Sequence, residues 1–466
     1  MQTKLLIDGD LVDGVDVIPV INPATAAPFA TAPRADAAQL DRAVAAARRA
    51  FPGWRDGGQA RRRDMLDRLA DAMEARAEDF ARLLVMEQGK PLGEAQFEVG
   101  ASIAAFRHFG AQALTSRTLV DEPASLVVEH YAPLGVVGCI VPWNFPMVLL
   151  AIKVAVAMST GNTVVAKPAP TTPLTALLLG EVATEILPPG VLNVIADAND
   201  LGGLLSAHPD VAKISFTGST GTGRKVMASA ADTLKRLTLE LGGNDAAIVL
   251  DDADPAEVAP ALFRAATFNA GQTCMAAKRI YVPDAMLGDI GDRLAALAEA
   301  AVPGSGLDPL TTIGPIQNRM QFDKLRDLMD DSVSRGTVLA GGGHDDRAGF
   351  FIRPMVVRDL GDDARLVQEE QFGPLIPLLS YARIDDALDR ANACPYGLGG
   401  TVWGTDLDRA ADVARRLDTG TVWINKHLDL RFDVPFGGVK QSGLGREQGK
   451  DGLHEFVSAR VVSMAR

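Results

Sequence analysis

Apolar residues recur at helical spacing in the first part of the chain, with charged residues between them. The pattern covers residues 37–50 and 59–87 and predicts amphipathic helices with solvated polar faces. The arginines at 61–63 fit one such face. The apolar stretch from Met147 to Met158 is interrupted by Lys153. It is too short for a bilayer core, which needs about 20 residues of helix, so we predict a buried helix there.

A β-rich pattern lies before that stretch, at residues 125–141, SLVVEHYAPLGVVGCIV, where Pro133 and Gly135 interrupt the apolar residues. It predicts an edge hairpin and then a core strand. Strand and helix patterns then alternate: NTVVAKP, a helix over 173–186, VLNVIA, a short helix, AKISFTG, and a helix from residue 221. Such alternation predicts a parallel, doubly wound sheet with helices on both faces.

A second α/β segment follows Gly243, with strands predicted at AAIVL and TVWIN. The sequence shows no internal repeat and no long linker. At 466 residues, a size of about 150 residues per domain predicts two or three domains. The fold class expected is therefore α/β.

Charge and cysteine content exclude several classes of protein. The net charge of -13 and a pI of about 5.0 oppose an extended nucleic-acid surface. The cysteines, Cys139, Cys274 and Cys394, are odd in number and widely spaced, which argues against a disulfide framework and fits a reducing cytoplasm. No Cys/His cluster suggests a metal. The N-terminus MQTKLLIDGD has no signal-peptide pattern, so we expect a cytoplasmic protein without membrane or nucleic-acid partners.

Two motifs offer a nucleophile and a base. FNAGQTCMAAKR places Cys274 after a Gly-Gln turn, and LTLELGGN places Glu240 after a strand pattern. A thiol attacks as thiolate when its surroundings activate it, and a glutamate can serve as general base. A buried structural cysteine and a structural carboxylate at a strand end are the alternative interpretations.

Two further motifs are weaker. In ISFTGSTGTGRKV the glycines Gly218, Gly221 and Gly223 run GxxGxG, which is not the dinucleotide fingerprint, and a tight βα turn explains them equally well. In PWNFP, Asn144 lies between two prolines directly after a strand. Its amide could donate to a reacting carbonyl oxygen, or it could cap the next helix.

Taken in order, the motifs span essentially the whole chain and resemble those of the aldehyde dehydrogenase superfamily. They are PWNFP, AKPAPTTP, FTGST, LELGGN, FNAGQTC, EEQFGP, PYGL and PFGGVKQSG. The resemblance implies a Rossmann-like cofactor domain at 1–115 and 134–242 and a catalytic domain at 243–441. It also implies oligomerisation segments at 116–133 and 442–466, within a homodimer or homotetramer; an exposed edge strand there would need cover from another chain.

The resemblance further implies a mechanism. Cys274 would attack the aldehyde carbon, and the amide of Asn144 with the Cys274 main-chain N–H would hold the oxyanion. Hydride would pass to the nicotinamide, and Glu240 would activate water to hydrolyse the thioester. Family members that pass the acyl group to coenzyme A generally lack this glutamate, so Glu240 favours the free acid as product.

The cofactor implied is NAD or NADP, with NAD favoured. Lys167 matches the lysine on the adenosine ribose, Ser219 the pyrophosphate site, and Glu370 the nicotinamide ribose. Pro170 stands where many NAD-preferring relatives have a glutamate that repels a 2'-phosphate, and Gly221 where relatives often have an acid, so dual use is expected. The full predicted site is Ile140, Val141, Pro142, Trp143, Lys167, Ala169, Pro170, Phe216, Thr217, Gly218, Ser219, Leu241, Gly242, Glu370 and Phe372.

The substrate tunnel is the least specific part of the resemblance. By position it would be lined by Leu149, Ile152, Phe268, Met275, Leu430 and Phe436. Ile152 and Phe268 stand where relatives acting on succinic semialdehyde have arginines, which predicts an apolar or aromatic aldehyde. His427 and Arg431 could meet a polar substrate tail or be solvated loop residues, and Met275 and Phe268 could be ordinary core residues.

Two other classes of protein remain as alternatives. A thiol hydrolase using Cys274 would need an orienting histidine, and no motif nominates one. A catalytically silent scaffold would be expected to lack Cys274, Glu240 or Asn144, yet the sequence has all three.

Overall fold

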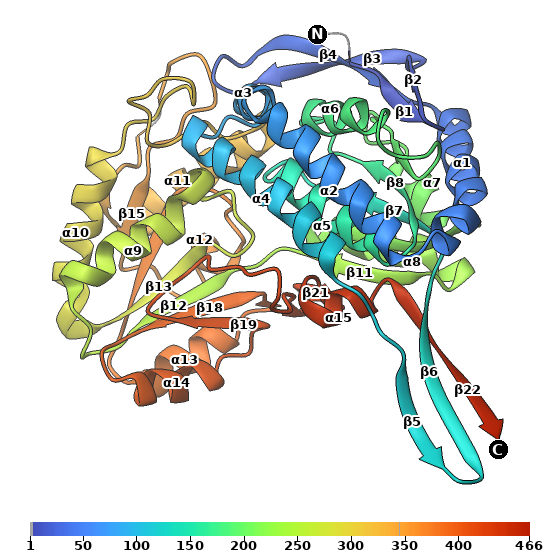
Figure 1. Ribbon diagram of the computed structural model, residues 1–466. Helices are drawn as coiled ribbons and strands as arrows, with labels where there is room; N and C mark the ends of the chain where they lie inside the picture. Colours follow the sequence, from blue (N-terminus) through green and yellow to red (C-terminus); the bar gives the residue numbers. More distant parts are fainter. Residues whose placement is uncertain (1–2, 344) are drawn as a thin grey trace.

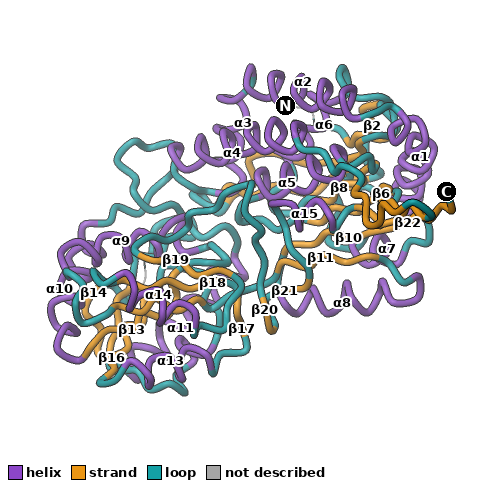
Figure 2. The backbone as a smooth tube through the Cα atoms, turned by 60° about the horizontal axis from the view of Figure 1, so that its bottom comes forward, coloured by secondary structure: helices purple, strands orange, loops and turns teal. Residues whose placement is uncertain are grey.

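The computed structural model describes residues 3–343 and 345–466, so the first two residues of the predicted 1–115 segment lie outside it. The chain forms two lobes, each built around a sheet, and a small third sheet that projects from one lobe (Figure 1). Helices cover the two large sheets (Figure 2). The α/β class predicted from the alternating pattern is confirmed.

The first lobe is built on an eight-stranded sheet of order β2-β1-β9-β8-β7-β10-β11-β21. Strands β7 to β11 are parallel, and β1, β2 and β21 are antiparallel additions at the two edges. Every residue of β7 and β8 is buried, and β7 and the centre of β8 are apolar, as expected of parallel strands covered on both faces. The strands of this sheet are β1 (Leu5–Ile7), β2 (Asp10–Val12), β7 (Val136–Ile140), β8 (Thr163–Lys167), β9 (Leu192–Val194), β10 (Val211–Thr217), β11 (Arg236–Glu240) and β21 (Gly443–Leu444).

The strand order reverses between β7 and β10. From β7 the chain proceeds outward through β8 and β9 on one side, and through β10 and β11 on the other. In doubly wound sheets, ligands bind beyond the carboxyl ends of the strands at such a switch point. The helices of this lobe are α1 (Ala37–Asp56), α2 (Gln59–Ala75), α3 (Ala77–Gln88), α4 (Leu92–Ala111), α5 (Pro146–Ser159), α6 (Leu174–Ala183), α7 (Gly202–Ala207) and α8 (Thr220–Ala230), with a 3-10 turn at Ala231–Thr233.

The second lobe is built on a seven-stranded sheet of order β14-β15-β16-β13-β12-β18-β19, parallel except for β14. Its strands are β12 (Asp245–Val249), β13 (Ala277–Pro283), β14 (Thr337–Ala340), β15 (Met355–Arg358), β16 (Leu375–Tyr381), β18 (Gly399–Trp403) and β19 (Thr421–Ile424). Its helices are α9 (Pro255–Thr267), α10 (Leu287–Ala300), α11 (Arg319–Arg335), α12 (Arg365–Gln368), α13 (Ile384–Asn392) and α14 (Leu407–Arg415), with 3-10 turns at Phe268–Gly271 and Asp284–Met286.

The third sheet contains β5 (Arg117–Glu122), β6 (Ser125–Pro133) and β22 (Val457–Ala465), all antiparallel. The bounds of the hairpin predicted within residues 125–141 are wrong, because the hairpin consists of β5 and β6 and its first strand lies before residue 125. The core strand that follows is β7. The C-terminal strand β22 pairs with β6 along its whole length. The remaining elements are the hairpin β3 (Asp16–Asn22) and β4 (Ala27–Arg34), the pair β17 (Tyr396–Gly397) and β20 (Val439–Lys440), and α15 (Gly449–His454).

Four details of the sequence prediction need correction. The stretch 59–87 is two helices, because the chain breaks at Arg76 between α2 and α3. The predicted helix 173–186 is confined to α6. TVWIN forms the edge strand β19 and is mostly half-buried, unlike the fully buried β12. Arg62 also differs from a solvated residue, because its guanidinium donates to the main-chain oxygen of Ser159 at 3.0 Å.

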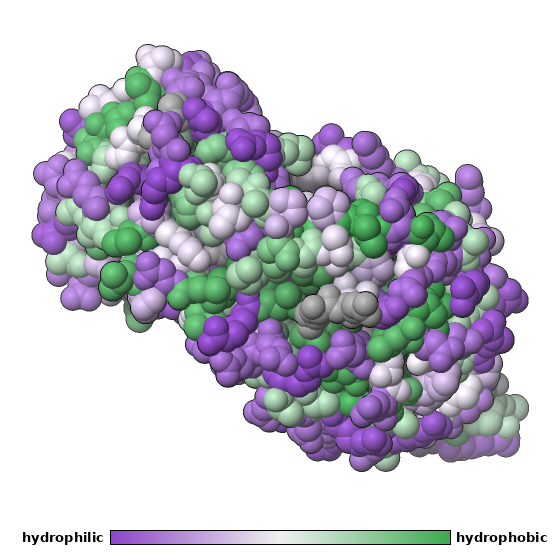
Figure 3. Space-filling model, turned by 90° about the horizontal axis from the view of Figure 1, so that it is seen from above, coloured by the Kyte–Doolittle hydropathy of each residue, from purple (hydrophilic) through white to green (hydrophobic). Residues whose placement is uncertain are grey.

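The prediction for Met147–Met158 is confirmed, because this stretch lies in α5 and most of its residues are buried. Within the described ranges, none of the helices combines the length and the hydropathy needed to cross a bilayer. Figure 3 shows hydrophilic residues over much of one face, with hydrophobic residues in patches between them.

Candidate active site

Cys274 lies on the short segment between the 3-10 turn Phe268–Gly271 and strand β13, and its side chain is half-buried. It packs with Met275 against a small apolar cluster that includes Trp423 and Phe436. Burial raises the pKa of the Cys274 thiol to about 12, and the Lys278 ammonium is the main influence that lowers it. Within residues 3–343 and 345–466, no protein acceptor pairs with the main-chain N–H of Cys274.

The backbone before Cys274 is held in an uncommon conformation. Asn269 and Ala270 have φ values of 53° and 54°, in the left-handed region that non-glycine residues rarely adopt. Gly271 follows with φ 72°, and a Cβ there would lie 2.3 Å from the main-chain oxygen of Gly373. Such strain persists only where the surroundings fix it. Here Gln272 does so, because its amide donates to the main-chain oxygen of Asn269 at 3.0 Å.

Asn144 lies in the loop between β7 and α5 and is 3 % exposed. Its Nδ2 donates to the main-chain oxygen of Gln272 at 3.0 Å, which ties this loop to the Cys274 segment. It does not cap α5, because the cap residue of that helix is Phe145 and no side-chain cap bond forms. One N–H of the Asn144 amide is therefore committed to the protein, and the amide has a second.

A buried ion pair supports the same loop. Lys90 Nζ lies 2.5 Å from Glu98 Oε2, with both side chains fully buried, and donates to the main-chain oxygen of Asn144 at 3.0 Å. The other oxygen of Glu98 accepts from the main-chain N–H groups of Met147 and Val148, in the first turn of α5. The first N–H groups of a helix have no acceptor within the helix, so these bonds satisfy two of them and fix where α5 begins.

Glu240 is the last residue of β11 and is 4 % exposed. Burial raises its pKa well above the usual value, the carboxylate of Glu447 raises it further, and Lys153 lowers it. Its Oε1 is buried without a hydrogen-bond partner in the described part of the chain. Gly437, next to Phe436 of the cluster beside Cys274, lies against Glu240, since a Cβ on Gly437 would be 2.9 Å from Glu240 Oε1.

Lys153 and Glu447 form a buried ion pair behind Glu240, and Lys153 Nζ lies 3.2 Å from Ser215 Oγ. The two charged residues are 294 positions apart in the sequence. No motif links them, so this pair was not predictable. In the sequence, Lys153 is visible only as an interruption of an apolar helix.

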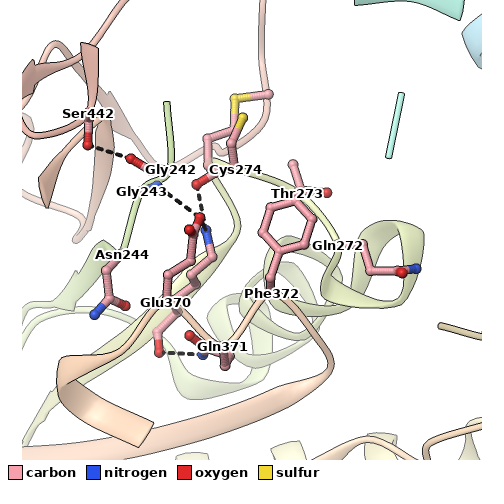
Figure 4. Close-up of polar contacts among 12 residues, drawn as sticks. Gly242, Gly243, Asn244, Gln272, Thr273, Cys274, Glu370, Gln371, Phe372 and Ser442 are labelled. Carbon is pink, nitrogen blue, oxygen red and sulfur yellow. Dashed lines mark hydrogen bonds and ion pairs between the residues drawn. The ribbon is translucent and has the colours of Figure 1, made fainter. Parts of the chain in front are cut away.

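Glu370 lies beside the Gly242–Gly243 turn and close to Cys274 (Figure 4). Its Oε1 accepts from the main-chain N–H of Gly243 at 2.9 Å. A Cβ on Gly242 would lie 2.3 Å from Glu370 Oε2, so a larger residue there would displace the Glu370 carboxylate. Lys278 donates to the main-chain oxygen of Cys274 at 2.5 Å and lies 3.7 Å from Glu370 Oε1. The sequence prediction had not singled out Lys278.

The residues predicted for cofactor binding lie mainly at the carboxyl ends of β7, β8, β10 and β11. Lys167 ends β8, and its Nζ is paired with the buried Asp197 at 2.6 Å. Ser219 caps α8, and its hydroxyl accepts from the main-chain N–H of Thr222. The others in this group are Ile140, Val141, Pro142 and Trp143 after β7, Ala169 and Pro170 after β8, Phe216, Thr217 and Gly218 at β10, and Leu241 and Gly242 after β11.

Glu370 and Phe372 come from the second lobe. The Phe372 ring meets the Trp143 ring edge-on, with centroids 5.4 Å apart. The loop after α12 therefore meets the loop after β7, across the two lobes.

The structure brings only some of the predicted tunnel residues together. Phe436 and Met275 pack with Cys274. Phe268 stacks on Phe145, next to Asn144, at 5.9 Å between ring centroids. The other three are Leu149 and Ile152, which lie on α5, and Leu430, which is 39 % exposed on a loop.

His427 and Arg431 have different surroundings. His427 Nε2 lies 2.6 Å from the main-chain oxygen of Met275, to which it donates, and burial lowers its pKa to about 4. It is therefore neutral at physiological pH. Arg431 is exposed and forms an ion pair with Asp433 at 2.9 Å.

A cavity of about 540 Å³ lies between α4, α9 and α10. Phe268 forms part of its wall, but Cys274 does not. Phe97 and Phe263 add aromatic surface, and Arg264 adds a positive charge. This cavity is adjacent to the candidate site and does not contain the predicted nucleophile.

Comparisons with known proteins agree with this arrangement. A profile of the Aldehyde dehydrogenase family matches residues 12–462. The putative aldehyde dehydrogenase FUS7 of Gibberella fujikuroi is 39 % identical over 443 residues, which is 94 % of each chain. The NAD+ complex of an aldehyde dehydrogenase from Bacillus cereus has a TM-score of 0.97 at 33 % identity and covers 100 % of this chain and 97 % of its own. An NADP dependent enzyme of E. coli has a TM-score of 0.97 at 34 % identity, with 100 % and 98 % covered.

Proposed function

This chain belongs to the aldehyde dehydrogenase family, which oxidises aldehydes to carboxylic acids, and we propose that Cys274 carries the acyl group in this reaction. The observation that supports the proposal most directly is the state of Glu240. Its carboxyl group is buried, one oxygen has no partner in the described part of the chain, and its charge reaches the Cys274 thiol. A carboxyl group in this position suits a general base that takes a proton from water.

In the first step, Cys274 Sγ bonds to the aldehyde carbon and the carbonyl oxygen becomes an oxyanion. Two donors support this charge: the second N–H of the Asn144 amide and the main-chain N–H of Cys274. Asn144 is preorganised for this role, because Lys90 and Gln272 hold it from both sides. Each donor of this type contributes about 10²- to 10³-fold in rate.

The residues at the switch point suit a dinucleotide. Helix α8 begins directly beyond β10, and the N-terminus of a helix favours a pyrophosphate. Thr217 Oγ1 is buried there without a hydrogen-bond partner among the described residues, and a Cβ on Gly221 would meet nothing within 4 Å. Lys167 would face the adenosine end and Glu370 the nicotinamide ribose. Bound NAD or NADP supplies the acceptor for the hydride that the tetrahedral adduct loses.

Loss of the hydride leaves a thioester on Cys274. Glu240 then takes a proton from water, and the hydroxide oxygen bonds to the thioester carbon. The C–S bond breaks, the free carboxylic acid leaves, and Cys274 is released as thiolate. The main remaining alternative, a hydrolase that pairs Cys274 with a histidine, receives no support from His427, whose donor is committed to Met275.

We further propose an apolar or aromatic aldehyde as substrate, because Phe436, Met275 and Phe268 give the surroundings of Cys274 an apolar character. Ile152 provides no charge for an anionic tail. The cofactor is proposed as NAD or NADP, since Pro170 can neither bind the adenosine ribose hydroxyls nor repel a 2'-phosphate. The three free cysteines agree with a cytoplasmic location.

The domain limits are also proposals. The first sheet supports a cofactor domain at 1–115 and 134–242, with β21 of the 442–466 segment added at its edge. The second sheet supports a catalytic domain at 243–441. The segments 116–133 and 442–466 are proposed to mediate a homodimer or homotetramer. Part of this surface is apolar: Val461 is 59 % exposed on the edge strand β22, and Met464 is 44 % exposed.

The test is a pre-steady-state assay of the purified protein with panels of aliphatic, aromatic and semialdehyde substrates and each cofactor. A burst of reduced-cofactor absorbance that is lost in Cys274→Ala is expected. Product formation without reduced cofactor would instead indicate hydrolase chemistry, and no reaction with any aldehyde would indicate a silent scaffold.

A further inference from the structure

Lys278 is a buried lysine that the proposed reaction does not use. It is the second residue of β13, four positions after Cys274, and its side chain is 2 % exposed. Burying an ammonium group is costly unless partners compensate it. The partners present are the main-chain oxygen of Cys274 at 2.5 Å and Glu370 Oε1 at 3.7 Å. The cation therefore contacts both the nucleophile's segment and the residue proposed for the nicotinamide ribose.

The backbone around Lys278 is fixed by the segment that carries Glu370. Gln371 Nε2 donates to the main-chain oxygen of Lys278 at 3.1 Å and to that of Leu375 at 3.0 Å. The neighbouring Phe372 ring lies 5.8 Å from the Lys278 ammonium. Strand β13 and the 370–372 segment therefore form one unit, and Lys278 has little freedom to move away from Cys274.

The charges around the thiol are unbalanced without Lys278. Glu240 at the end of β11, Asp245 on β12 and Glu370 each oppose a negative charge on Cys274. Lys278 is the principal cation that favours it. Three carboxyl groups beside a nucleophile that must ionise are a poor environment for a thiolate.

We infer that Lys278 is a positioning residue: its ammonium stabilises the Cys274 thiolate and holds the Glu370 carboxylate at a fixed distance from it. This inference rests on the proposed function of Cys274. The inference assigns a role to a residue that the sequence motifs did not single out. It also explains why the Lys278 ammonium is buried. The groups that face Lys278 and Cys274 are Glu240, Asp245, Glu370, Lys324 and His427, of which His427 is neutral at physiological pH.

The test measures the reactivity of Cys274 without aldehyde or cofactor. The rate of iodoacetamide alkylation at Cys274 is followed by mass spectrometry of its peptide from pH 6 to 10 in the parent protein and in Lys278→Met. We expect alkylation to be roughly tenfold slower in the variant at each pH, because loss of the cation raises the pKa of the thiol by about one unit or more and the whole range lies below that pKa. Lys278→Arg, which keeps the charge, should restore most of the parent profile.

Lys324→Met is the matched control. Lys324 is also a partly buried lysine beside Glu370, but it donates to the main-chain oxygen of that residue at 2.6 Å. Its removal should leave the alkylation rate unchanged. An unchanged alkylation rate in Lys278→Met would overturn the inference and leave Lys278 with a packing role only. If the Met variant loses its folded circular dichroism, Lys278→Gln removes the charge and keeps a hydrogen-bond donor, and the same criterion applies to it.

The alkylation assay also separates this inference from the proposed function. If the protein does not oxidise aldehydes but Lys278→Met slows alkylation as expected, the role of Lys278 toward the thiol stands and the proposed reaction is refuted. If the protein oxidises aldehydes but Lys278→Met does not slow alkylation, the proposed reaction stands and the role of Lys278 is refuted.

Discussion

The side-chain amide of Asn144 donates a hydrogen bond to the main-chain oxygen of Gln272, at 3.0 Å. This bond joins the loop after β7 in the first lobe to the segment before Cys274 in the second. Lys90 and Asn269 donate to the main-chain oxygen of Asn144 at 3.0 and 2.9 Å. The amide is therefore oriented by the protein before any substrate arrives.

Asn144→Ala is expected to reduce kcat/KM by about 10²- to 10³-fold, because one oxyanion donor is removed. The main-chain oxygen of Gln272 also loses a partner, so the melting temperature should fall modestly. Steady-state kinetics and thermal unfolding measure the two effects. The alkylation rate of Cys274 by iodoacetamide serves as the control, and a rate that falls as far as kcat/KM would show that the variant damages the nucleophile itself.

Glu240→Gln should retain acylation and lose most deacylation, since glutamine cannot take a proton from water. Mass spectrometry of a single turnover should find the acyl group on the Cys274 peptide. The burst of reduced cofactor should remain while the steady-state rate falls by about 10²- to 10⁴-fold. Normal turnover with no trapped acyl group would exclude Glu240 as the base.

The pH dependence of deacylation should reflect the raised pKa of Glu240. A general base works deprotonated, so a raised pKa moves the rising limb of the pH profile to higher pH. Glu447→Gln removes a carboxylate that raises this pKa, and the limb should move to lower pH. Lys153→Met removes a cation that lowers it, and the limb should move to higher pH. Stopped-flow measurements of deacylation from pH 5 to 9 provide the comparison; shifts in the same direction for both variants would contradict this electrostatic account.

Pro170 should allow comparable kcat/KM with NAD and NADP. A preference above about 10³-fold, roughly 4 kcal/mol, for either cofactor would contradict this prediction. Pro170→Glu should reduce the use of NADP by about tenfold or more, because a carboxylate there opposes the 2'-phosphate. Pro170→Gln is the uncharged control and should affect the two cofactors similarly.

Val461→Asp should weaken self-association if β22 forms part of a subunit interface, because it places a charge on an apolar edge strand. Sedimentation velocity of the variant should show a smaller species than the parent. Val333→Asp is the control, since Val333 is 49 % exposed on α11, outside the third sheet. A monomeric parent protein would refute the proposed assembly directly.

Much of the fold could be predicted because many of its strands and helices are marked by short patterns of neighbouring residues. The parallel core strands β7 and β8 contain short apolar runs, VVGCI and VVA, and these runs can be recognised in a single sequence. The break between α2 and α3 could not be predicted, because Arg76 is neither glycine nor proline and residues on both sides favour helix. Packing of α3 against α4 and α6 decides that boundary.

The site divides in the same way. Cys274, Glu240 and Asn144 lie in short motifs, and their types alone suggest a nucleophile, a base and a donor. Lys278 carries no such signal, because a lysine at the start of a strand is normally exposed, and only the position of Glu370 makes it a buried cation. Glu447 could not be predicted for another reason. Its partner Lys153 is far away in the sequence, and no sequence pattern marks an ion pair between residues that far apart.

The pairing of β21 with β11 has a consequence for how the protein is made. Residues 443–457 complete the first lobe: Gly443 pairs with Glu240, Glu447 with Lys153, and Asn162 donates to the main-chain oxygen of Phe456. During synthesis at about 5–20 residues per second, the first lobe emerges long before these residues do. The nascent chain therefore holds Lys153 without its carboxylate until Glu447 has been made, and only then does Glu240 gain its final surroundings.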